Sequence, residues 1–195
     1  MKFCSQCGSP VKQEIPEMDN RLRYVCPACK TIHYENPKVI AGALPIHDGR
    51  ILLCKRAIEP RHGYWTLPAG FMENEETTPQ AAQRETLEEA NARVSVHHLI
   101  SMIDVPYISQ VHMFFHATLD DLDFSAGEES LEVDLFKPSE IPWDEIAFAT
   151  VKKTLQHFLH HDRLSDESVG HIPLLVDHIE ISDRMKKLIE ESKND

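Results

Sequence analysis

The chain has 195 residues and a formal net charge of −12. Hydrophobic residues make up 42% and charged residues 27%, which is ordinary for a soluble globular protein with one main domain and an appendage. No apolar run approaches the roughly 18 residues that span a bilayer, and no signal peptide is recognisable, so we expect a cytoplasmic protein without membrane segments. The acidic balance argues against a protein that coats nucleic acid, because such proteins carry a basic patch.

Residues 1–35 contain two C-x-x-C pairs, Cys4 with Cys7 and Cys26 with Cys29. The 18 residues between the pairs are a spacing typical of a tetrahedral Cys₄ zinc site. The segment has too few apolar residues to fold without a metal. Disulfides are the alternative, but a reducing cytosol disfavours them, and neither pair stands between a strand and a helix as a redox motif does. We therefore predict a structural zinc ribbon.

Residues 36–165 have the pattern of an α/β domain, and the sequence ENPKV marks the hinge that leads into it. Two apolar segments flank the turn Asp48-Gly49, which predicts a β-hairpin. Residues 166–195 are expected to be a helical C-terminal extension. The elements expected in chain order are strands at 39–47 and 50–58, a helix at 77–91, strands at 93–103, 110–119 and 132–138, and helices at 148–161 and 183–192.

The helix at 77–91 concentrates negative charge. Glu85, Glu88 and Glu89 stand at positions i, i+3 and i+4, so their side chains point the same way. Two carboxylates about 5–6 Å apart repel by roughly 3 kcal/mol at an effective dielectric of about 20, before salt screening. Arg84 lies toward Glu88 alone on this helix, so a divalent cation such as Mg²⁺ or Mn²⁺ is the economical counter-charge. A solvated helix face is the alternative.

The same helix completes a longer motif that begins at Gly70. Gly70, five residues, Glu76, seven residues and the run Arg84-Glu85-Thr86-Leu87-Glu88-Glu89 reproduce the spacing Gly-x5-Glu-x7-Arg-Glu-U-x-Glu-Glu-x-Gly-U of the Nudix hydrolases, where U is a bulky apolar residue. The chain departs from the motif at Thr86, Asn91 and Ala92. Asparagine tolerates the left-handed conformation, so we expect the helix to end as it does in the family.

This resemblance implies a Nudix α/β/α sandwich with a mixed sheet, and hydrolysis of a nucleoside diphosphate linked to another moiety. In the family, motif carboxylates hold divalent cations against the diphosphate. Carried over residue by residue, these are Glu85, Glu88 and Glu89, with Mg²⁺ or Mn²⁺ as the catalytic cation. Gly70 is expected to end a strand and to let its carbonyl approach the metal, and Arg84 to form an ion pair with Glu76 that ties the loop to the helix.

The resemblance extends from the ribbon to residue 150, through NPKV, LLCKRAIEPRHGYWTLPAGF, GEESLEVDLF and IAFAT. Over this length the chain is similar to the plant plastid FAD pyrophosphatases and their bacterial zinc-ribbon relatives, which cleave FAD to FMN and AMP and also accept ADP-ribose. The ribbon-bearing NADH pyrophosphatases carry Ser-Gln-Pro-Trp-Pro-Phe-Pro-x-Ser where this chain reads SMIDVPYISQVHMFF. FAD and ADP-ribose therefore rank ahead of NADH and NAD-capped RNA ends. The resemblance also implies a homodimer.

One further carboxylate is expected from across the cleft, as a metal ligand or as the base that takes a proton from water. The segment GEESLEVDLF offers Glu128, Glu129 and Glu132, and resemblance to the family's Glu-containing loop favours Glu129. The alternative is a merely acidic surface loop.

Substrate contacts are less specific in the sequence. Arg56 is a candidate for substrate phosphate, and Tyr64, Phe71 and Tyr107 are candidates for stacking on adenine or flavin, although each could equally be a surface or core residue. Two other functions stay open. One is a nucleotide-sensing or nucleic-acid-binding Nudix protein without catalysis, which usually loses motif carboxylates that this chain keeps. The other is a hydrolase of mononucleotides or sugar nucleotides.

Overall fold

The computed structural model describes residues 1–161 and 172–181. The chain divides into two compact units, Met1–Pro37 and Lys38–Asp195. Within the described ranges, no helix has the length and apolar character needed to cross a bilayer.

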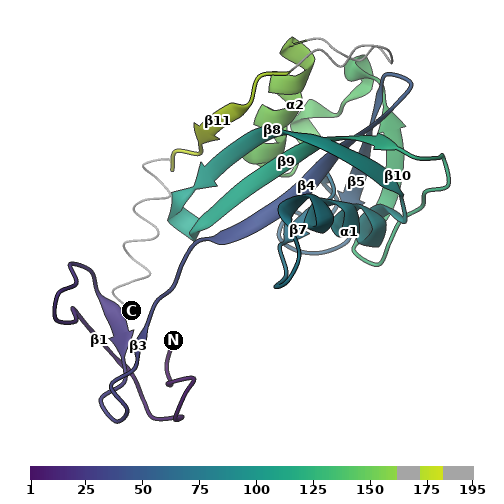
Figure 1. Cartoon of the computed structure of the whole chain (residues 1–195). Coiled ribbons are helices and arrows are strands. Elements are labelled where there is room, and N and C mark those ends of the chain that lie inside the picture. Colours follow the sequence, from purple (N-terminus) through teal and green to yellow (C-terminus); the bar gives the residue numbers. More distant parts are fainter. Residues whose placement is uncertain (162–171, 182–195) are drawn as a thin grey trace. The chain divides into compact units, whose positions relative to one another are not determined.

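The smaller unit is a three-stranded antiparallel sheet with the order β1-β2-β3 (Figure 1). Its strands are β1 (Lys12–Glu14), β2 (Arg23–Val25) and β3 (Ile32–His33). Each C-x-x-C pair closes a turn, because the amides of Gly8 and Lys30 donate to the carbonyls of Cys4 and Cys26. Four residues of this unit are buried, namely Cys4, Val25, Cys26 and His33. So small a core cannot by itself offset the entropy of folding about 37 residues.

The larger unit is built on an eight-stranded mixed sheet with a helix on each face (Figure 1). The main order is β10-β5-β4-β9-β8-β11, with β6 paired to β5 and β7 paired to β4. The pairs β4–β9 and β8–β11 are parallel and the others antiparallel. The strands are β4 (Lys38–His47), β5 (Arg50–Arg56), β6 (Trp65–Thr66), β7 (Ala69–Phe71), β8 (Val94–Val105), β9 (Gln110–Leu119), β10 (Ser130–Phe136) and β11 (Leu175–His178).

Alternation along the central strands divides the core into two layers. On one face, α2 (Ala149–His160) buries Val151, Leu155 and Phe158 against a cluster that includes Leu44 and Leu53. On the other face, α1 (Thr78–Ala90) packs with a cluster that holds Ala43, Leu52 and Phe115. The neighbours Ala43 and Leu44 thus serve opposite layers, and the expected α/β/α sandwich is confirmed.

Local signals determine both ends of α1. Thr77 is the N-cap, and its side chain accepts from the amide of Gln80 while the Gln80 side chain accepts from the amide of Thr77, a capping box. Asn91 ends the helix with φ at 48°, in the left-handed region, and its amide donates to the carbonyl of Leu87 at 2.8 Å. The expected exit at Asn91 is therefore confirmed. Thr86 is fully buried and donates its hydroxyl to the Ala82 carbonyl at 2.7 Å.

The structure differs from some of the expected elements, and one expected element is not tested by it. The described part of the C-terminal extension contains the strand β11, which pairs in parallel with β8, rather than helix. The helix expected at 183–192 lies outside the described residues. The strand β6 and the short 3₁₀ helices η1 (Pro106–Ile108), η2 (Pro138–Glu140) and η3 (Trp143–Glu145) were not expected, because segments of two or three residues show no periodicity. Gly70 was expected to end a strand, but β7 continues to Phe71.

Candidate active site

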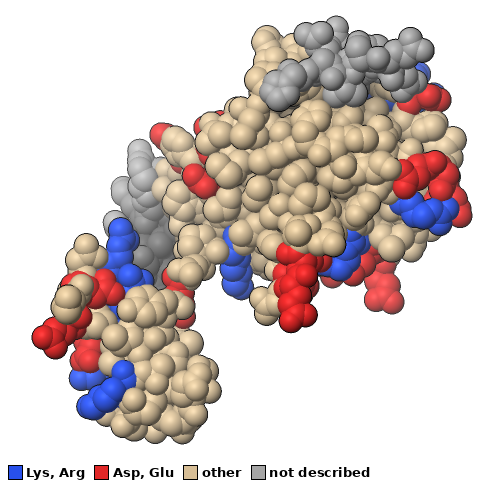
Figure 2. All heavy atoms as spheres, in the orientation of Figure 1, with Lys and Arg blue, Asp and Glu red and all other residues tan. Residues whose placement is uncertain are grey.

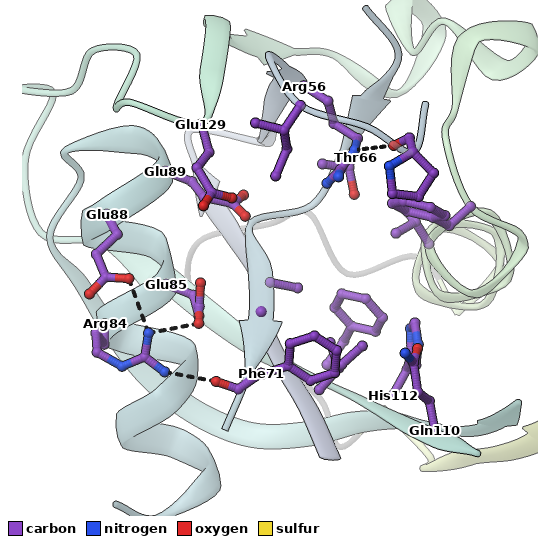
Figure 3. A pocket seen from close by; sticks show the side chains of 18 of the residues that line it. Arg56, Thr66, Phe71, Arg84, Glu85, Glu88, Glu89, Gln110, His112 and Glu129 are labelled. Carbon is purple, nitrogen blue, oxygen red and sulfur yellow. Dashed lines mark hydrogen bonds and ion pairs between the residues drawn. The ribbon is translucent and has the colours of Figure 1, made fainter. Parts of the chain in front are cut away.

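A cavity of about 590 Å³ in the larger unit brings together α1, the strands β4, β5, β7 and β9, the first turn of α2 and the loop before β10. Glu85, Glu88, Glu89 and Glu129 lie at one end, and Gln110 and His112 lie at the other, with Phe71 between the two ends (Figure 3). The motif glutamates and a group of apolar side chains therefore line the same cavity.

The three motif glutamates of α1 line this cavity but differ in burial. Glu85 is 9% exposed and Glu89 is 6% exposed, whereas Glu88 is exposed to solvent. Burial, together with the charges of Glu85 and Glu129, raises the pKa of Glu89 to about 8, although the charge of Arg56 opposes this rise. Burial likewise raises the pKa of Glu85. The two carboxylates are thus held where their ionised forms require a counter-charge.

Arg84 has more hydrogen-bond partners than the sequence predicted. It donates through Nε and Nη2 to both oxygens of Glu76, at 3.0 and 2.7 Å, so the expected ion pair is present and bidentate. The expectation that Arg84 faces Glu88 alone was wrong: Nη1 donates to Glu85 at 2.7 Å and to Glu88 at 3.0 Å, and Nη2 donates to the carbonyl of Phe71 at 3.1 Å. A planar guanidinium has five donors, so one arginine can hold the loop, β7 and two helix carboxylates together.

Gly70 provides the space in which Glu85 sits. It lies in β7 opposite Ala41 of β4, and a Cβ built on it would be 2.3 Å from the carboxylate carbon and both oxygens of Glu85. Only a residue without a side chain lets that carboxylate lie against the backbone. This close approach places the backbone of Gly70 beside the acidic end of the cavity.

Glu129 is the one of the three candidates on its loop that lines the cavity, among the described residues. Its carboxylate lies beside that of Glu89 (Figure 3), and its charge raises the pKa of both Glu85 and Glu89. Glu132 instead forms an ion pair with Lys55 at 3.3 Å.

Gly127 explains how the loop of Glu129 comes so close to α1. Its amide donates to the carbonyl of Glu89 at 3.0 Å, and a Cβ on it would lie 1.8 Å from the carbonyl oxygen of Glu88. The carbonyl of Glu129 accepts from the amide of Ala57 at 2.8 Å. The loop is thus anchored on two sides.

The donors at this end of the cavity fit Mg²⁺ or Mn²⁺, which prefer oxygen ligands. They are the carboxylates of Glu85, Glu88, Glu89 and Glu129 and the carbonyl of Gly70. Among described residues, only a cysteine group brings every ligand atom within 4.8 Å of the others. To bind one cation, the glutamate oxygens would therefore have to move closer together. Glu85 and Glu88 would then give up their hydrogen bonds to Arg84. A bound cation supplies Lewis-acid chemistry and a water of lowered pKa.

Two of the four substrate-binding candidates line the cavity. Arg56 does so, with its Nε donating to the carbonyl of Pro60 at 2.9 Å and its guanidinium carbon 5.0 Å from the ring centroid of Phe148. Phe71 also lines it. Tyr64 and Tyr107 are 36% and 39% exposed and lie outside the described lining, so their ligand roles stay predictions.

Sequence reasoning missed the residues at the far end of the cavity. Gln110, His112 and Phe114 occupy alternate positions of β9, and Phe148 and Val151 come from the start of α2. A signal was present, since two polar side chains alternate within the otherwise apolar segment QVHMFF. It becomes meaningful only when the strand is known to face a cavity.

The four cysteines of the smaller unit bring all their sulfur atoms within 4.8 Å of one another. Cys4 and Cys29 are 3.6 Å apart at Sγ, and Cys7 and Cys26 are 3.5 Å apart. A tetrahedral site with zinc–sulfur bonds of about 2.3 Å requires sulfurs roughly 3.8 Å apart, whereas a disulfide requires about 2.05 Å. The arrangement therefore fits four separate thiolates around one zinc ion.

Two side chains support these sulfurs. His33 is buried, with Nε2 3.3 Å from the Sγ of Cys4. The hydroxyl of Thr31 lies 3.1 Å from the Sγ of Cys29. Hydrogen bonds from the side chain and the backbone of Thr31, with those of the neighbouring cysteines, lower the pKa of Cys29 to about 6. Such contacts favour the thiolate form that binds metal.

Comparison with known proteins agrees with both units. Residues 36–158 match the family model of the NUDIX domain, and residues 2–35 match the zinc-ribbon model described as Nudix N-terminal. A solved structure of a NUDIX hydrolase from Nitrosomonas europaea is 53% identical, with a TM-score of 0.85, and the match covers 92% of this chain and 99% of that one. An ADP-ribose pyrophosphatase from Streptococcus suis, 20% identical with a TM-score of 0.57 over 73% of this chain and 100% of its own, shares the fold.

Among curated proteins, the NAD-capped RNA hydrolase NudC of Vibrio atlanticus is 31% identical over 150 residues, which are 75% of this chain and 50% of that protein. The NudC of Vibrio vulnificus is also 31% identical, over 73% of this chain and 50% of its own length. The chain thus spans about half the length of the curated relatives it matches. With the domain match, the motif carboxylates and the sandwich fold in agreement, the chain belongs to the Nudix hydrolases and carries their N-terminal zinc ribbon.

Proposed function

We propose that this enzyme hydrolyses the diphosphate bond of a nucleoside diphosphate linked to a second moiety, with FAD and ADP-ribose as the first candidates. The observation that carries the proposal is the shared cavity, which has buried carboxylates at one end and an apolar, aromatic chamber at the other. A diphosphate needs cations at one end of such a site, and a nucleoside needs an apolar surface at the other.

In this proposal each residue has a role that depends on its position in the cavity. Glu85, Glu88, Glu89 and the carbonyl of Gly70 would hold Mg²⁺ or Mn²⁺, and Glu129 would be a further ligand or the base that accepts a proton from water. Arg84, paired with Glu76 and bonded to the carbonyl of Phe71, would tie β7 and the loop after it to α1. Arg56 lies close enough to Glu89 to lower its pKa and would reach a substrate phosphate.

A second candidate is hydrolysis of NADH or of NAD-capped RNA ends. It is favoured by the NudC relatives at 31% identity. Against it stand the missing Ser-Gln-Pro-Trp-Pro-Phe-Pro-x-Ser segment, which the chain replaces with SMIDVPYISQVHMFF, and the acidic character of the chain. On the face shown in Figure 2, Lys and Arg side chains are scattered and several lie next to Asp or Glu. An RNA-binding face would gather them into a continuous patch.

The test is a substrate panel of FAD, ADP-ribose, NADH and NAD-capped RNA, assayed with Mg²⁺ and with Mn²⁺. We expect AMP release from FAD and ADP-ribose at higher kcat/KM than from the NAD compounds. Glu89→Ala should lower turnover on the order of 10²–10⁴-fold, as loss of a catalytic group does. Glu132→Ala is the matched control, because Glu132 pairs with Lys55 outside the cavity. Tight binding of these compounds without hydrolysis would instead support a non-catalytic nucleotide sensor.

A further inference from the structure

Three polar side chains form a hydrogen-bonded chain in the wall of the cavity farthest from the glutamates. Nε2 of His112 lies 3.0 Å from Oε1 of Gln110, and Nδ1 of His112 lies 3.1 Å from the hydroxyl oxygen of Thr150. Gln110 and His112 are on β9 and half-buried, and Thr150 is 3% exposed in the first turn of α2. The chain of bonds therefore links the sheet to a helix.

The chemistry of the three groups determines the direction of these bonds. Oε1 of Gln110 can only accept, so Nε2 of His112 must carry the proton and donate. Nδ1 of a neutral imidazole then accepts, and the hydroxyl of Thr150 donates to it. Burial lowers the pKa of His112 to about 4, in agreement with a neutral ring near pH 7.

The hydrogen bond from His112 orients the side-chain amide of Gln110, and its amide nitrogen stays available as a donor. Its oxygen is occupied by His112, and among the described residues its nitrogen has no hydrogen-bond partner. Gln110 lines the cavity, as does His112 (Figure 3). A fixed donor that faces an otherwise apolar chamber is suited to an acceptor atom on a ligand.

The surroundings indicate the kind of ligand group that this donor would meet. Ile40, Ile108, Phe71, Phe114 and Phe148 supply the neighbouring apolar lining. In Figure 3 the ring of Phe71 lies between the acidic end and the Gln110–His112 end. A planar heterocycle can pack against such side chains while one polar atom on its edge meets Gln110.

We propose that Gln110 is a specificity-determining residue that donates a hydrogen bond to a ring nitrogen or carbonyl oxygen on the heterocycle of the substrate. His112 and Thr150 are its positioning residues. The inference rests on the proposed function, because a diphosphate held at the glutamates places the heterocycle toward the far end of the cavity.

The test compares Gln110→Ala and Gln110→Glu with the wild-type enzyme on FAD and ADP-ribose. Gln110→Ala should raise KM about five- to fiftyfold and change kcat less than threefold, as loss of one hydrogen bond to bound substrate does. Gln110→Glu keeps an oxygen acceptor for His112 but removes the donor, so it should bind substrate at least as weakly as the alanine variant. Wild-type KM in Gln110→Glu would mean that Gln110 only supports His112, and would overturn the proposal.

The positioning role has its own readout. Thr150→Val should raise KM two- to fivefold in the wild type and have no further effect in Gln110→Ala, because it acts through Gln110. Thr154→Val is the matched control: its hydroxyl donates to the backbone carbonyl of Thr150 at 2.9 Å and bonds Ser101 at 2.8 Å, but it contacts neither His112 nor the Thr150 hydroxyl through these bonds. It should leave KM unchanged. Equal KM increases from Thr150→Val in both backgrounds would refute the relay.

A binding measurement separates this inference from the proposed function. Calorimetric titration with ADP-ribose and with FAD, in the absence of divalent metal, is made on the wild type and on Gln110→Ala. If the wild type hydrolyses neither compound, the proposed function fails, and the titration then decides the inference. At least fivefold weaker binding by Gln110→Ala supports the role of Gln110, whereas equal binding, or none by the wild type, overturns it.

Discussion

Gly70→Ala is a small change with a large expected effect on turnover. The new Cβ would lie 2.3 Å from the carboxylate of Glu85, whereas ordinary contact begins at 3.4 Å, so the carboxylate must move by about 1.1 Å. A displacement of about 1 Å in a catalytic constellation can cost on the order of 10²-fold in rate. We therefore expect kcat to fall about a hundredfold.

Stability should change little in this variant. The atoms in the way are the end of a flexible side chain, and Gly70 does not occupy the left-handed region, so alanine strains no backbone. We expect the free energy of unfolding, measured by urea denaturation, to stay within about 1 kcal/mol of the wild type.

Gly42→Ala is the matched control on the paired strand. Its Cβ would meet the Cβ of Ala69 at 2.4 Å and the backbone oxygen of Pro68 at 2.6 Å. Because backbone cannot swing away, this variant should lose about 1–3 kcal/mol of stability. If Gly70→Ala folds normally and keeps turnover within threefold of the wild type at all Mg²⁺ concentrations, the placement of Glu85 against Gly70 is not needed for catalysis, and the reasoning is wrong.

Cys26→Ser should lower the stability of the ribbon by several kcal/mol and release zinc, as measured by circular dichroism and metal analysis. The protein that remains folded should keep its Mg²⁺ dependence. Normal folding with zinc retained would contradict the Cys₄ site. Glu129→Ala should lower turnover at least tenfold, whereas Glu128→Ala should change turnover little. If Glu129→Ala keeps wild-type turnover across pH 6–9, Glu129 is neither a metal ligand nor the base. Burial lowers the pKa of His112 and His116 to about 4 from the ordinary histidine value of about 6.5. The unfolded chain then binds more protons between those pH values, so urea titrations should show a stability loss on the order of 1–3 kcal/mol per histidine as pH falls from 6.5 to 4, and a flat profile would count against it. Light scattering should give a dimer of the 22.3 kDa chain, and a monomer mass would end that expectation.

Several features of the site were predictable because they are local or depend on spacing. The ends of α1, capped by Thr77 and Asn91, follow from the side chains at these two positions. The bidentate pair of Arg84 with Glu76 follows from a motif in which both positions have fixed spacing. The four cysteines converge because two short turns can bring two pairs to one point.

Other features depended on which surfaces meet. Glu85 and Glu89 became buried and Glu88 did not, although all three lie on one side of the same helix, because β7 and the loop before β10 cover only part of it. Leu87 of the same helix is apolar and yet 51% exposed, whereas Ala81 and Ala82 are fully buried. The period of a helix predicts which residues share a face, but not which face another element covers.

The family, the cysteine spacing of the ribbon and most element boundaries could be inferred from the sequence, since these depend on spacing, capping and alternation within short stretches of chain. Only the tertiary structure decided that β11 joins the sheet, that Gly127 brings Glu129 against α1, and that Gln110, His112 and Thr150 meet in one cavity wall. Thr150 is 38 residues from His112 along the chain. Contacts at such separations are chosen by the packing of a helix on a sheet, and no local preference of the backbone encodes them.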